Sequence, residues 1–211
     1  MTHKPDKYEK SGVCLLDADR AMIMVHGRGA TAQSILELAK YFRQPGMAFI
    51  APQATGNTWY PHSFMIPLEQ NEPDLSSALD VIGNVTDRVL GNGILPENIF
   101  LLGFSQGACL ALEFAARNAR RYGGVFGLSG GLIGPDGTPR NYAGDFGGTP
   151  VFLGCSDVDA HIPKRRVLES AAVFQKMGAA VDTQIYPGMP HTIIEDEINR
   201  VKKMLETVSG K

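Results

Sequence analysis

The sequence predicts a doubly wound α/β fold, in which a mostly parallel sheet carries helices on both of its faces. Short apolar segments alternate with longer segments of helical length along the 211 residues. Several of these apolar segments are continuous runs, which is typical of strands that helices cover on both sides. Hydrophobic residues make up 44% of the chain and charged residues 20%, a balance that indicates a globular protein rather than a disordered chain.

Six segments are predicted to be strands, because each is a short apolar run next to turn-forming residues. They are residues 21–27, 47–53, 98–104, 123–129, 149–155 and 181–188. Residues 12–16 are a candidate for an additional edge strand. We expect one domain over residues 1–211, with residues 1–11 as a polar N-terminal extension. No cap domain is expected, since the two long loops, near 54–72 and 130–148, are too short to form one.

Five segments have the length or the 3.6-residue periodicity of helices. They are residues 31–42, 73–90, 107–119 and 164–177, and a last helix that begins at Thr192. The third is apolar nearly all round, which favours burial against the sheet. Gly178 matches a C-terminal cap of the fourth helix, and Thr192 with Glu195 matches a capping box at the start of the fifth.

Charge and cysteine content exclude several classes of protein. Lys and Arg number 20 against 22 Asp and Glu, so the charge gives no reason to expect nucleic acid or an anionic membrane as a partner. Three cysteines without a CxxC pair, at positions 14, 109 and 155, fit neither a disulfide framework nor a zinc site. We expect a cytoplasmic protein, because residues 1–10 hold no apolar signal segment and no apolar run is long enough to span a membrane.

The sequence GFSQG at 103–107 matches G-x-S-x-G, the pattern of a nucleophile elbow. GLSGG at 127–131 matches as well, so the pattern alone does not decide between the two serines. Ser105 follows a predicted strand and precedes a buried helix, which is the context that the elbow requires. Ser129 runs into a segment rich in Gly and Pro, and we expect it to begin a loop that borders the site. Ser105 is therefore the candidate nucleophile, with an ordinary helix N-cap as the alternative.

A serine hydroxyl needs a base, and an acid that orients the base, to act as a nucleophile. His191 follows the last predicted strand and directly precedes the last helix, so we expect it to be the base. His161 is interpreted as a polar residue of a mobile loop, either at the surface or beside the site. The acid is expected just after the strand at 149–155, and we expect it to be Asp157, which lies closer to the strand end than Asp159. Asp159 could instead cap the next helix or bond to loop amides, and a metal site at these residues fits no strong ligand pattern.

Two backbone amides are expected to form an oxyanion hole, which stabilises the charge that develops on an attacked carbonyl. Gln106 directly follows the candidate nucleophile, and Arg28 lies in VHGRGA between two glycines that free the backbone. The Arg28 side chain could either meet an acidic or polar leaving group or be a solvated surface charge. His26, in the same segment, is expected to be a structural residue that bonds within its loop.

The loop at 54–72 concentrates large apolar side chains, which favours a wall of a substrate pocket over local packing. The residues expected to bind substrate there are Trp59, Tyr60, Phe64 and Met65. Cys109, one turn into the helix after Ser105, is expected to be a small buried filler.

Five segments, VHGRGA, GFSQGACLALEFA, GLSGG, LGCSDVDAHIP and YPGMPHT, occur in an order and at spacings that resemble the phospholipase/carboxylesterase family of small α/β-hydrolases. This family includes acyl-protein thioesterases, and the resemblance spans residues 12–208. It implies the α/β-hydrolase fold, and it places the acid three residues after Gly154. The site residues that it implies are Ser105, Asp157, His191, and the amides of Arg28 and Gln106. The acid loop DVDAHIP is longer than the family pattern.

These observations predict a serine carboxylesterase that hydrolyses short- to medium-chain esters or thioesters through an acyl-enzyme, without a metal or an organic cofactor. The expected partner is a small acyl ester or thioester, and a homodimer is compatible with the long apolar loop. Three alternatives stay open: a lyase or cofactor-free oxygenase on the same fold, a binding module without catalysis, and a metal-dependent hydrolase.

Overall fold

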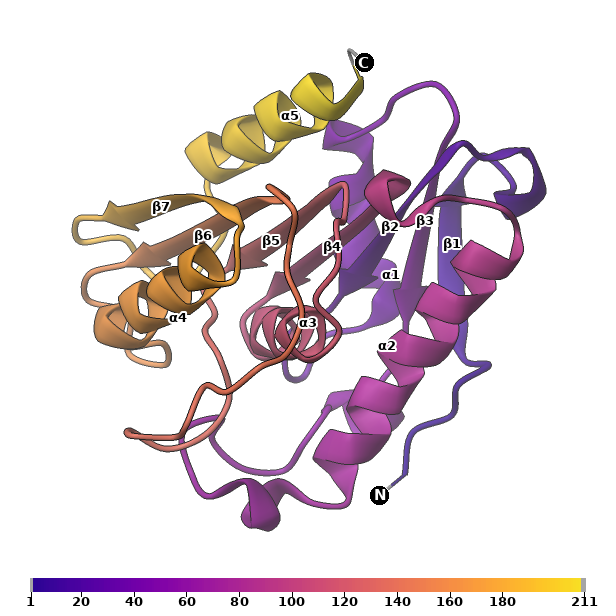
Figure 1. The fold of residues 1–211 in the computed structure, drawn as a ribbon. Helices are drawn as coiled ribbons and strands as arrows, with labels where there is room; N and C mark the ends of the chain where they lie inside the picture. Colours follow the sequence, from indigo (N-terminus) through magenta and orange to yellow (C-terminus); the bar gives the residue numbers. More distant parts are fainter. Residues whose placement is uncertain (1, 210–211) are drawn as a thin grey trace.

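The computed structural model describes residues 2–209, and in these residues seven strands form one sheet (Figure 1). The strands are β1 (Tyr8–Gly12), β2 (Arg20–Val25), β3 (Met47–Pro52), β4 (Ile99–Phe104), β5 (Gly124–Leu128), β6 (Pro150–Ser156) and β7 (Ala180–Tyr186). Their order across the sheet is β1-β3-β2-β4-β5-β6-β7. β1 runs antiparallel to β3, and every other neighbouring pair is parallel. The prediction of a mostly parallel, doubly wound sheet is confirmed, and the described residues form no separate cap domain.

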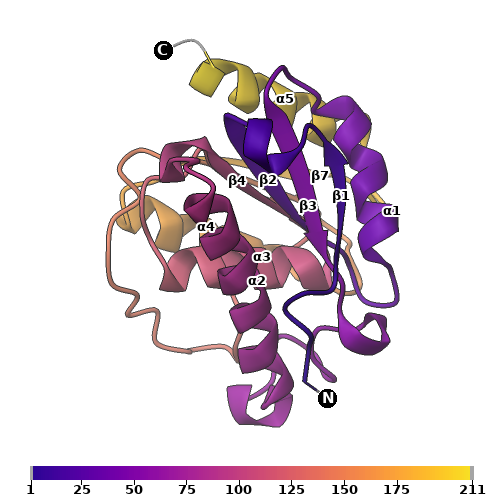
Figure 2. The ribbon, with the colours of Figure 1, turned by 90° about the vertical axis from the view of Figure 1, so that its right-hand side faces the viewer.

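Helices cover both faces of the sheet, as Figures 1 and 2 show from two directions. They are α1 (Ala32–Leu36), α2 (Asp74–Gly91), α3 (Gln106–Arg117), α4 (Lys164–Lys176) and α5 (Glu195–Ser209). α1 and α5 lie on one face, and α2, α3 and α4 lie on the other. Each face encloses its own apolar core. Met22 belongs to the core beside α1 and α5 and its neighbour Ile23 to the opposite core, because side chains alternate along a strand.

The six predicted strands are all present, with ends shifted by one or two residues at most. The predicted helix at 31–42 divides into α1 and a 3₁₀ segment, Glu37–Tyr41. Gly178, at φ 82°, follows the end of α4 as predicted. The capping box at Thr192 is wrong: α5 begins at Glu195, and the Ile194 N–H donates to the Glu197 carboxylate at 3.1 Å.

The N-terminal segment is more ordered than its polar composition predicts. The edge strand is β1, at residues 8–12 and not at 12–16, and it pairs with β3 along its whole length. Residues 8–11 are therefore part of the sheet rather than an extension. His3 is also buried, and its Nε2 lies 2.7 Å from the carbonyl oxygen of Trp59. Tertiary contacts with β3 and Trp59 hold this segment against the domain.

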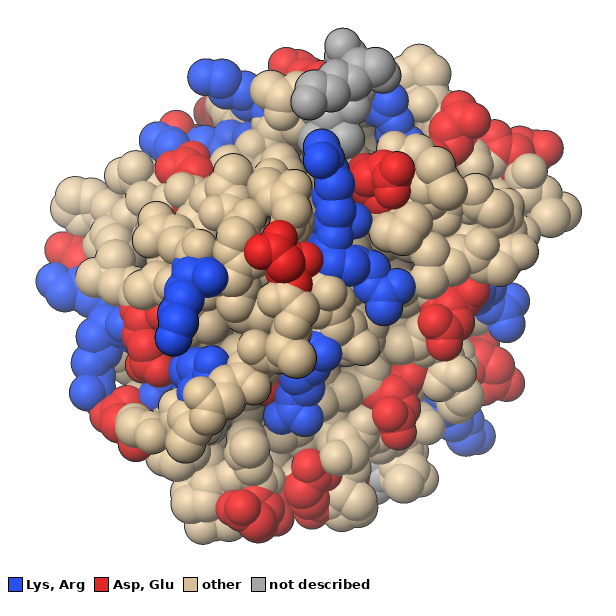
Figure 3. Space-filling model, in the orientation of Figure 1, with Lys and Arg blue, Asp and Glu red and all other residues tan. Residues whose placement is uncertain are grey.

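The surface in Figure 3 carries basic and acidic side chains interspersed, in keeping with a net charge of −2. Within residues 2–209, none of the helices combines the length and the apolarity that a membrane span requires. The loops that follow β4, β6 and β7 converge at one edge, because these parallel strands end on the same side of the sheet. That edge carries the candidate site.

Candidate active site

Ser105 lies on a strained turn between β4 and α3. Its φ of 55° and ψ of −122° lie in a region that residues with a side chain rarely adopt. The turn fits only because two glycines flank it: a Cβ at Gly103 would overlap the backbone of Gly107, and a Cβ at Gly107 would overlap the carbonyl of Val25. Strain of this kind persists only where the surrounding structure enforces it, and it concentrates at functional sites. The geometry is that of a nucleophile elbow.

His191 lies beside Ser105 as predicted. It belongs to the loop between β7 and α5, and its Nε2 is 2.9 Å from Ser105 Oγ. The ring of Phe104, the last residue of β4, lies 5.0 Å from the His191 ring and supports one face of it. The histidine side chain is 20% exposed, so the pair stays open to a substrate and to water.

The acid beside His191 is Asp159, and the prediction of Asp157 is wrong. Asp159 Oδ2 lies 2.6 Å from His191 Nδ1. Its other oxygen, Oδ1, accepts hydrogen bonds from the amides of His161 and Ile162 at 2.8 and 3.0 Å. Burial opposes ionisation of this carboxyl, but the His191 contact and the two amide hydrogen bonds outweigh burial and lower the pKa of Asp159. The carboxylate is therefore held ionised and oriented from both sides.

Asp157 contacts a loop amide instead of His191, so closeness to the strand end did not identify the acid. Its Oδ1 accepts the N–H of Gly188 at 2.8 Å, in the loop that leads to His191. β6 runs on to Ser156, and the amides that bind Asp159 Oδ1 fold the chain back after it. This turn carries Asp159 to the histidine. Bonding to loop amides, the alternative considered for Asp159, occurs through one carboxylate oxygen and leaves the other for His191.

The two expected oxyanion-hole residues, Arg28 and Gln106, both border the cavity at Ser105. Gln106 is the first residue of α3, so its N–H lies among the free donors of a helix N-terminus. Gly29, next to Arg28, has φ 75° and donates its N–H to the Asn57 carbonyl. The hydrogen bond from Gly29 to Asn57 therefore anchors the chain directly after Arg28.

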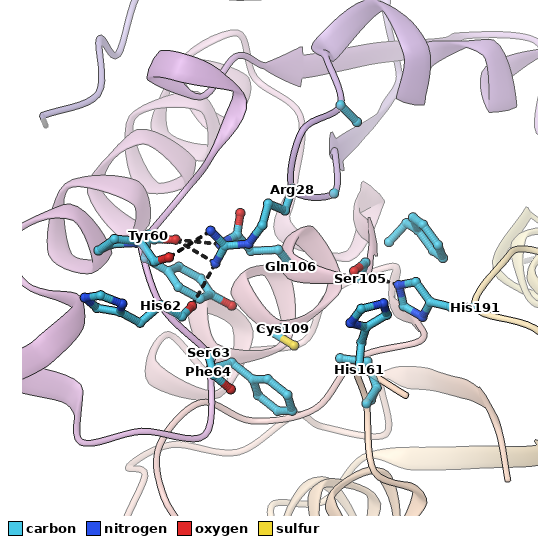
Figure 4. A pocket seen from close by; sticks show the side chains of 15 residues that line it. Arg28, Tyr60, His62, Ser63, Phe64, Ser105, Gln106, Cys109, His161 and His191 are labelled. Atoms are coloured by element: carbon cyan, nitrogen blue, oxygen red, sulfur yellow. Dashed lines mark hydrogen bonds between the residues drawn. The ribbon is translucent and has the colours of Figure 1, made fainter. Parts of the chain in front are cut away.

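The side chains of Arg28 and Gln106 hold the loop opposite Ser105 (Figure 4). The Arg28 guanidinium donates to the carbonyl oxygens of Tyr60, Pro61 and His62 at 2.9, 2.9 and 2.7 Å. The Gln106 side chain donates to Tyr60 O at 2.8 Å and accepts the N–H of Trp59 at 3.0 Å. Arg28 is exposed, as a solvated surface charge would be, but its guanidinium also binds these three carbonyl oxygens, a role that neither interpretation includes. The sequence holds no signal for this clamp, because the acceptors are backbone carbonyls.

A cavity of about 500 Å³ opens beside Ser105. Tyr60 and Phe64 line it as predicted, but Trp59 and Met65 do not. Trp59 is wholly buried, and its Nε1 donates to the carbonyl oxygen of His26 at 2.8 Å. Met65 packs against the apolar core. The loop therefore forms the cavity wall over residues 60–64, and the residues on either side of this run, Trp59 and Met65, pack into the protein instead.

Residues outside the predicted set also border the cavity. They are Phe104, Cys109, Ile162 and His161, together with backbone and side-chain atoms of residues 61–63. The His161 ring lies 4.9 Å from that of His191, which agrees with the second interpretation of His161, a polar residue beside the site. Burial raises the pKa of the Cys109 thiol to about 12, which keeps it neutral and in that respect unreactive.

Two other predictions concern residues next to the site. His26 is structural, as expected: its Nδ1 lies 2.8 Å from Gly27 O and its Nε2 accepts the Ala54 N–H at 3.1 Å. Ser129 begins the loop after β5 but is wholly buried and does not line the cavity. In residues 2–209, no three His, Cys, Asp or Glu side chains are grouped so that they could hold a metal ion.

Comparisons with known proteins show which family the chain resembles. A family profile described as Phospholipase/Carboxylesterase matches residues 16–209. Acyl-protein thioesterase 1 of Kluyveromyces lactis is 31% identical over 212 residues, which cover 89% of this chain and 91% of the relative. The protein of the same name from Saccharomyces cerevisiae is 28% identical, with 90% and 92% covered. The crystal structure of a phospholipase/carboxylesterase from Dyadobacter fermentans is 48% identical and superposes with a TM-score of 0.94, covering 98% of both chains.

Proposed function

The chain belongs to the phospholipase/carboxylesterase family and is a hydrolase that acts on ester bonds, and from this premise we propose that Ser105, His191 and Asp159 are its catalytic triad. The observation that carries the proposal is the pair of contacts that His191 makes. One ring nitrogen lies 2.9 Å from the Ser105 hydroxyl and the other lies 2.6 Å from the Asp159 carboxylate. This is the arrangement that activates a serine.

In the proposed reaction, Ser105 Oγ attacks the carbonyl carbon of the substrate while His191 Nε2 accepts the hydroxyl proton. The amides of Arg28 and Gln106 stabilise the oxyanion that forms. His191 then donates the proton to the departing alcohol or thiol, and an acyl-Ser105 remains. A water molecule, deprotonated by His191, attacks the acyl carbon and releases the carboxylic acid and the free serine.

Asp159 keeps His191 in the form that this reaction needs. A carboxylate at Nδ1 fixes the proton there, so that Nε2 is free to accept the proton of Ser105. The same carboxylate stabilises the imidazolium that forms in each half of the reaction. Because hydrogen bonds lower the pKa of Asp159 in spite of its burial, it stays ionised throughout this cycle.

The cavity supports a small acyl substrate. Its volume of about 500 Å³ lies toward the lower end of the range for small-molecule sites, which favours short to medium acyl chains in esters or thioesters. The cytoplasm as the compartment and a homodimer as the assembly remain predictions. Light scattering on the purified protein tests the second of these.

Labelling with a fluorophosphonate probe tests the proposal, because the probe reacts only with an activated serine. Intact-mass analysis should show one adduct on the wild type and none on Ser105→Ala. Ser129→Ala is the matched control: it removes the serine of the second G-x-S-x-G sequence, which lies outside the cavity, and it should still be labelled. A folded wild type without an adduct would refute the triad.

A further inference from the structure

One wall of the cavity holds a buried hydroxyl whose neighbour is a thiol. Tyr60 is 1% exposed and lines the cavity, and within residues 2–209 its hydroxyl has no nitrogen or oxygen partner, only the neighbouring Cys109 thiol, which is a weak acceptor. Tyr122 is equally buried, but its hydroxyl donates to the Asn118 carbonyl at 2.9 Å. Buried polar groups in native proteins are nearly always paired. The Tyr60 hydroxyl is therefore a candidate contact for a group that arrives with the substrate.

The position of this hydroxyl is fixed by the clamp that holds the loop. The Tyr60 carbonyl accepts hydrogen bonds from both Arg28 and Gln106, so the backbone below the ring is held at two points. Figure 4 shows the hydroxyl end of the ring turned toward Cys109. The Cys109 N–H donates to the carbonyl oxygen of Ser105 at 3.0 Å, and Ser105, Cys109 and Tyr60 all line the cavity. Tyr60 and the serine therefore border the same cavity.

The chemistry at this end of the cavity favours a neutral hydrogen-bond acceptor. Burial, followed by the effect of the neighbouring Cys109 thiol, raises the pKa of Tyr60 far above its ordinary value, so the hydroxyl keeps its proton to donate. The thiol is a weak acceptor. Phe64 and Ile162 complete this part of the wall with apolar surface, against which a neutral chain packs at a lower desolvation cost than a carboxylate.

The acyl part of the substrate is the part that reaches this hydroxyl. In the proposed reaction the oxyanion faces the amides of Arg28 and Gln106, and the leaving group takes its proton from His191. The acyl chain occupies the direction that remains, which leads from Ser105 along α3 toward Cys109, Phe64 and Tyr60 (Figure 4).

We propose that Tyr60 determines specificity by donating a hydrogen bond to an oxygen in the acyl chain, so that the enzyme prefers oxo-acyl esters to plain alkanoyl esters. This inference rests on the proposed function, since it requires an acyl group at Ser105. A site built to bond a substrate oxygen discriminates against the analogue that lacks it, because the protein group is then left unpaired.

Matched pairs of 4-nitrophenyl esters test the preference: pentanoate against 4-oxopentanoate, and hexanoate against 5-oxohexanoate. The measured quantity is the ratio of kcat/KM for the oxo ester to that for the plain ester, divided by the same ratio for hydrolysis by hydroxide. In the better pair this selectivity should be about tenfold for the wild type. Tyr60→Phe should bring it close to one, whereas Tyr122→Phe, which removes a buried hydroxyl elsewhere, should leave it unchanged.

A second variant keeps the test decisive if Tyr60→Phe does not fold. Cys109→Ser places a hydroxyl acceptor in front of Tyr60, so the ring finds a partner inside the protein and the selectivity should fall. Equal selectivity in the wild type and the folded variant would overturn the inference, and so would a wild type with no preference in either pair. Failure of the proposed function is distinguishable from both, because Ser105 would then take no fluorophosphonate label.

Discussion

Glu197 on α5 should make the protein less stable as the pH rises from about 4.5 to about 7. Its side chain is wholly buried, where a Cβ at Gly154 of β6 would meet its Oε1. Oε2 accepts the Ile194 N–H, and Oε1 has no partner within residues 2–209. Burial, with a smaller contribution from the charge of Asp196, raises the pKa of Glu197 from 4.5 to about 7.

The direction of this change in stability with pH follows from proton binding to Glu197. Between pH 4.5 and 7 the folded protein keeps a proton on Glu197 that the unfolded chain has released. The contribution of Glu197 to stability is therefore fully present below its pKa in the unfolded chain, and it is lost as the pH rises through its pKa in the folded protein. A shift of this size corresponds to about 3 kcal/mol of unfolding free energy over the whole window, of which about 2–3 kcal/mol falls between pH 5 and pH 8.5.

Glu197→Gln isolates this effect because glutamine has nearly the same shape and does not ionise. Urea denaturation of the wild type and the variant at pH 5 and at pH 8.5 gives the difference in unfolding free energy at each pH. That difference should shift by about 2–3 kcal/mol in favour of the variant at the higher pH. Contributions from other titrating groups occur in both proteins and cancel.

Glu195→Gln provides the control, since Glu195 begins the same helix and is exposed. Its difference from the wild type should stay within about 0.5 kcal/mol at both pH values. A difference for Glu197→Gln that stays constant from pH 5 to pH 8.5 would refute the reasoning, because it would mean that Glu197 ionises in the folded protein as easily as in the unfolded chain.

Three further predictions concern the site. Asp159→Asn should lower kcat by about 10⁴-fold, whereas Asp157→Asn should cost far less because its contact is a loop amide; equal losses in steady-state ester hydrolysis would contradict the assignment of the acid. Arg28→Met should lower kcat/KM by about 10–100-fold by releasing the loop that it clamps, while the yield of fluorophosphonate adduct on Ser105 after prolonged labelling should persist; unchanged kinetics would show that the clamp is dispensable. Gly107→Ala should cost about 3 kcal/mol or more, since its Cβ would overlap backbone carbonyls; thermal unfolding measures this, with Gly91→Ala, where a Cβ meets open space, as a control that should be nearly neutral.

Most of the fold could be predicted because its signals are local. Apolar runs located all six parallel strands, and Gly178 marked the end of α4. The edge strand β1 escaped this reasoning, since residues 8–12 are polar and pair only because β3 offers an unpaired edge. The start of α5 was also mispredicted for a tertiary reason. Glu197 is buried against the sheet and its carboxylate accepts the N–H of Ile194, so the helix begins at Glu195 and the capping box at Thr192 does not form.

In the candidate site, too, residues set by local motifs could be predicted and residues set by loop contacts could not. Ser105 and His191 could be predicted from short motifs, because an elbow between a strand and a helix and a loop before the last helix leave their positions little freedom. The choice of Asp157 as the acid was wrong, because both Asp157 and Asp159 lie within three residues of the strand end and closeness to that end does not decide between them. Hydrogen bonds between Asp159 and two amides of its own loop made that choice.

The sequence by itself determined the α/β architecture, the elbow serine, the histidine that faces it and the family, because these depend on residue types at fixed spacings. Only the tertiary structure decided which aspartate meets His191, which aromatic side chains of the loop face the cavity, and what Arg28 holds. Each of these depends on the path of a loop and on contacts between residues far apart in the chain. The physical reason is that loop paths follow from backbone hydrogen bonds and packing that form only when distant segments meet.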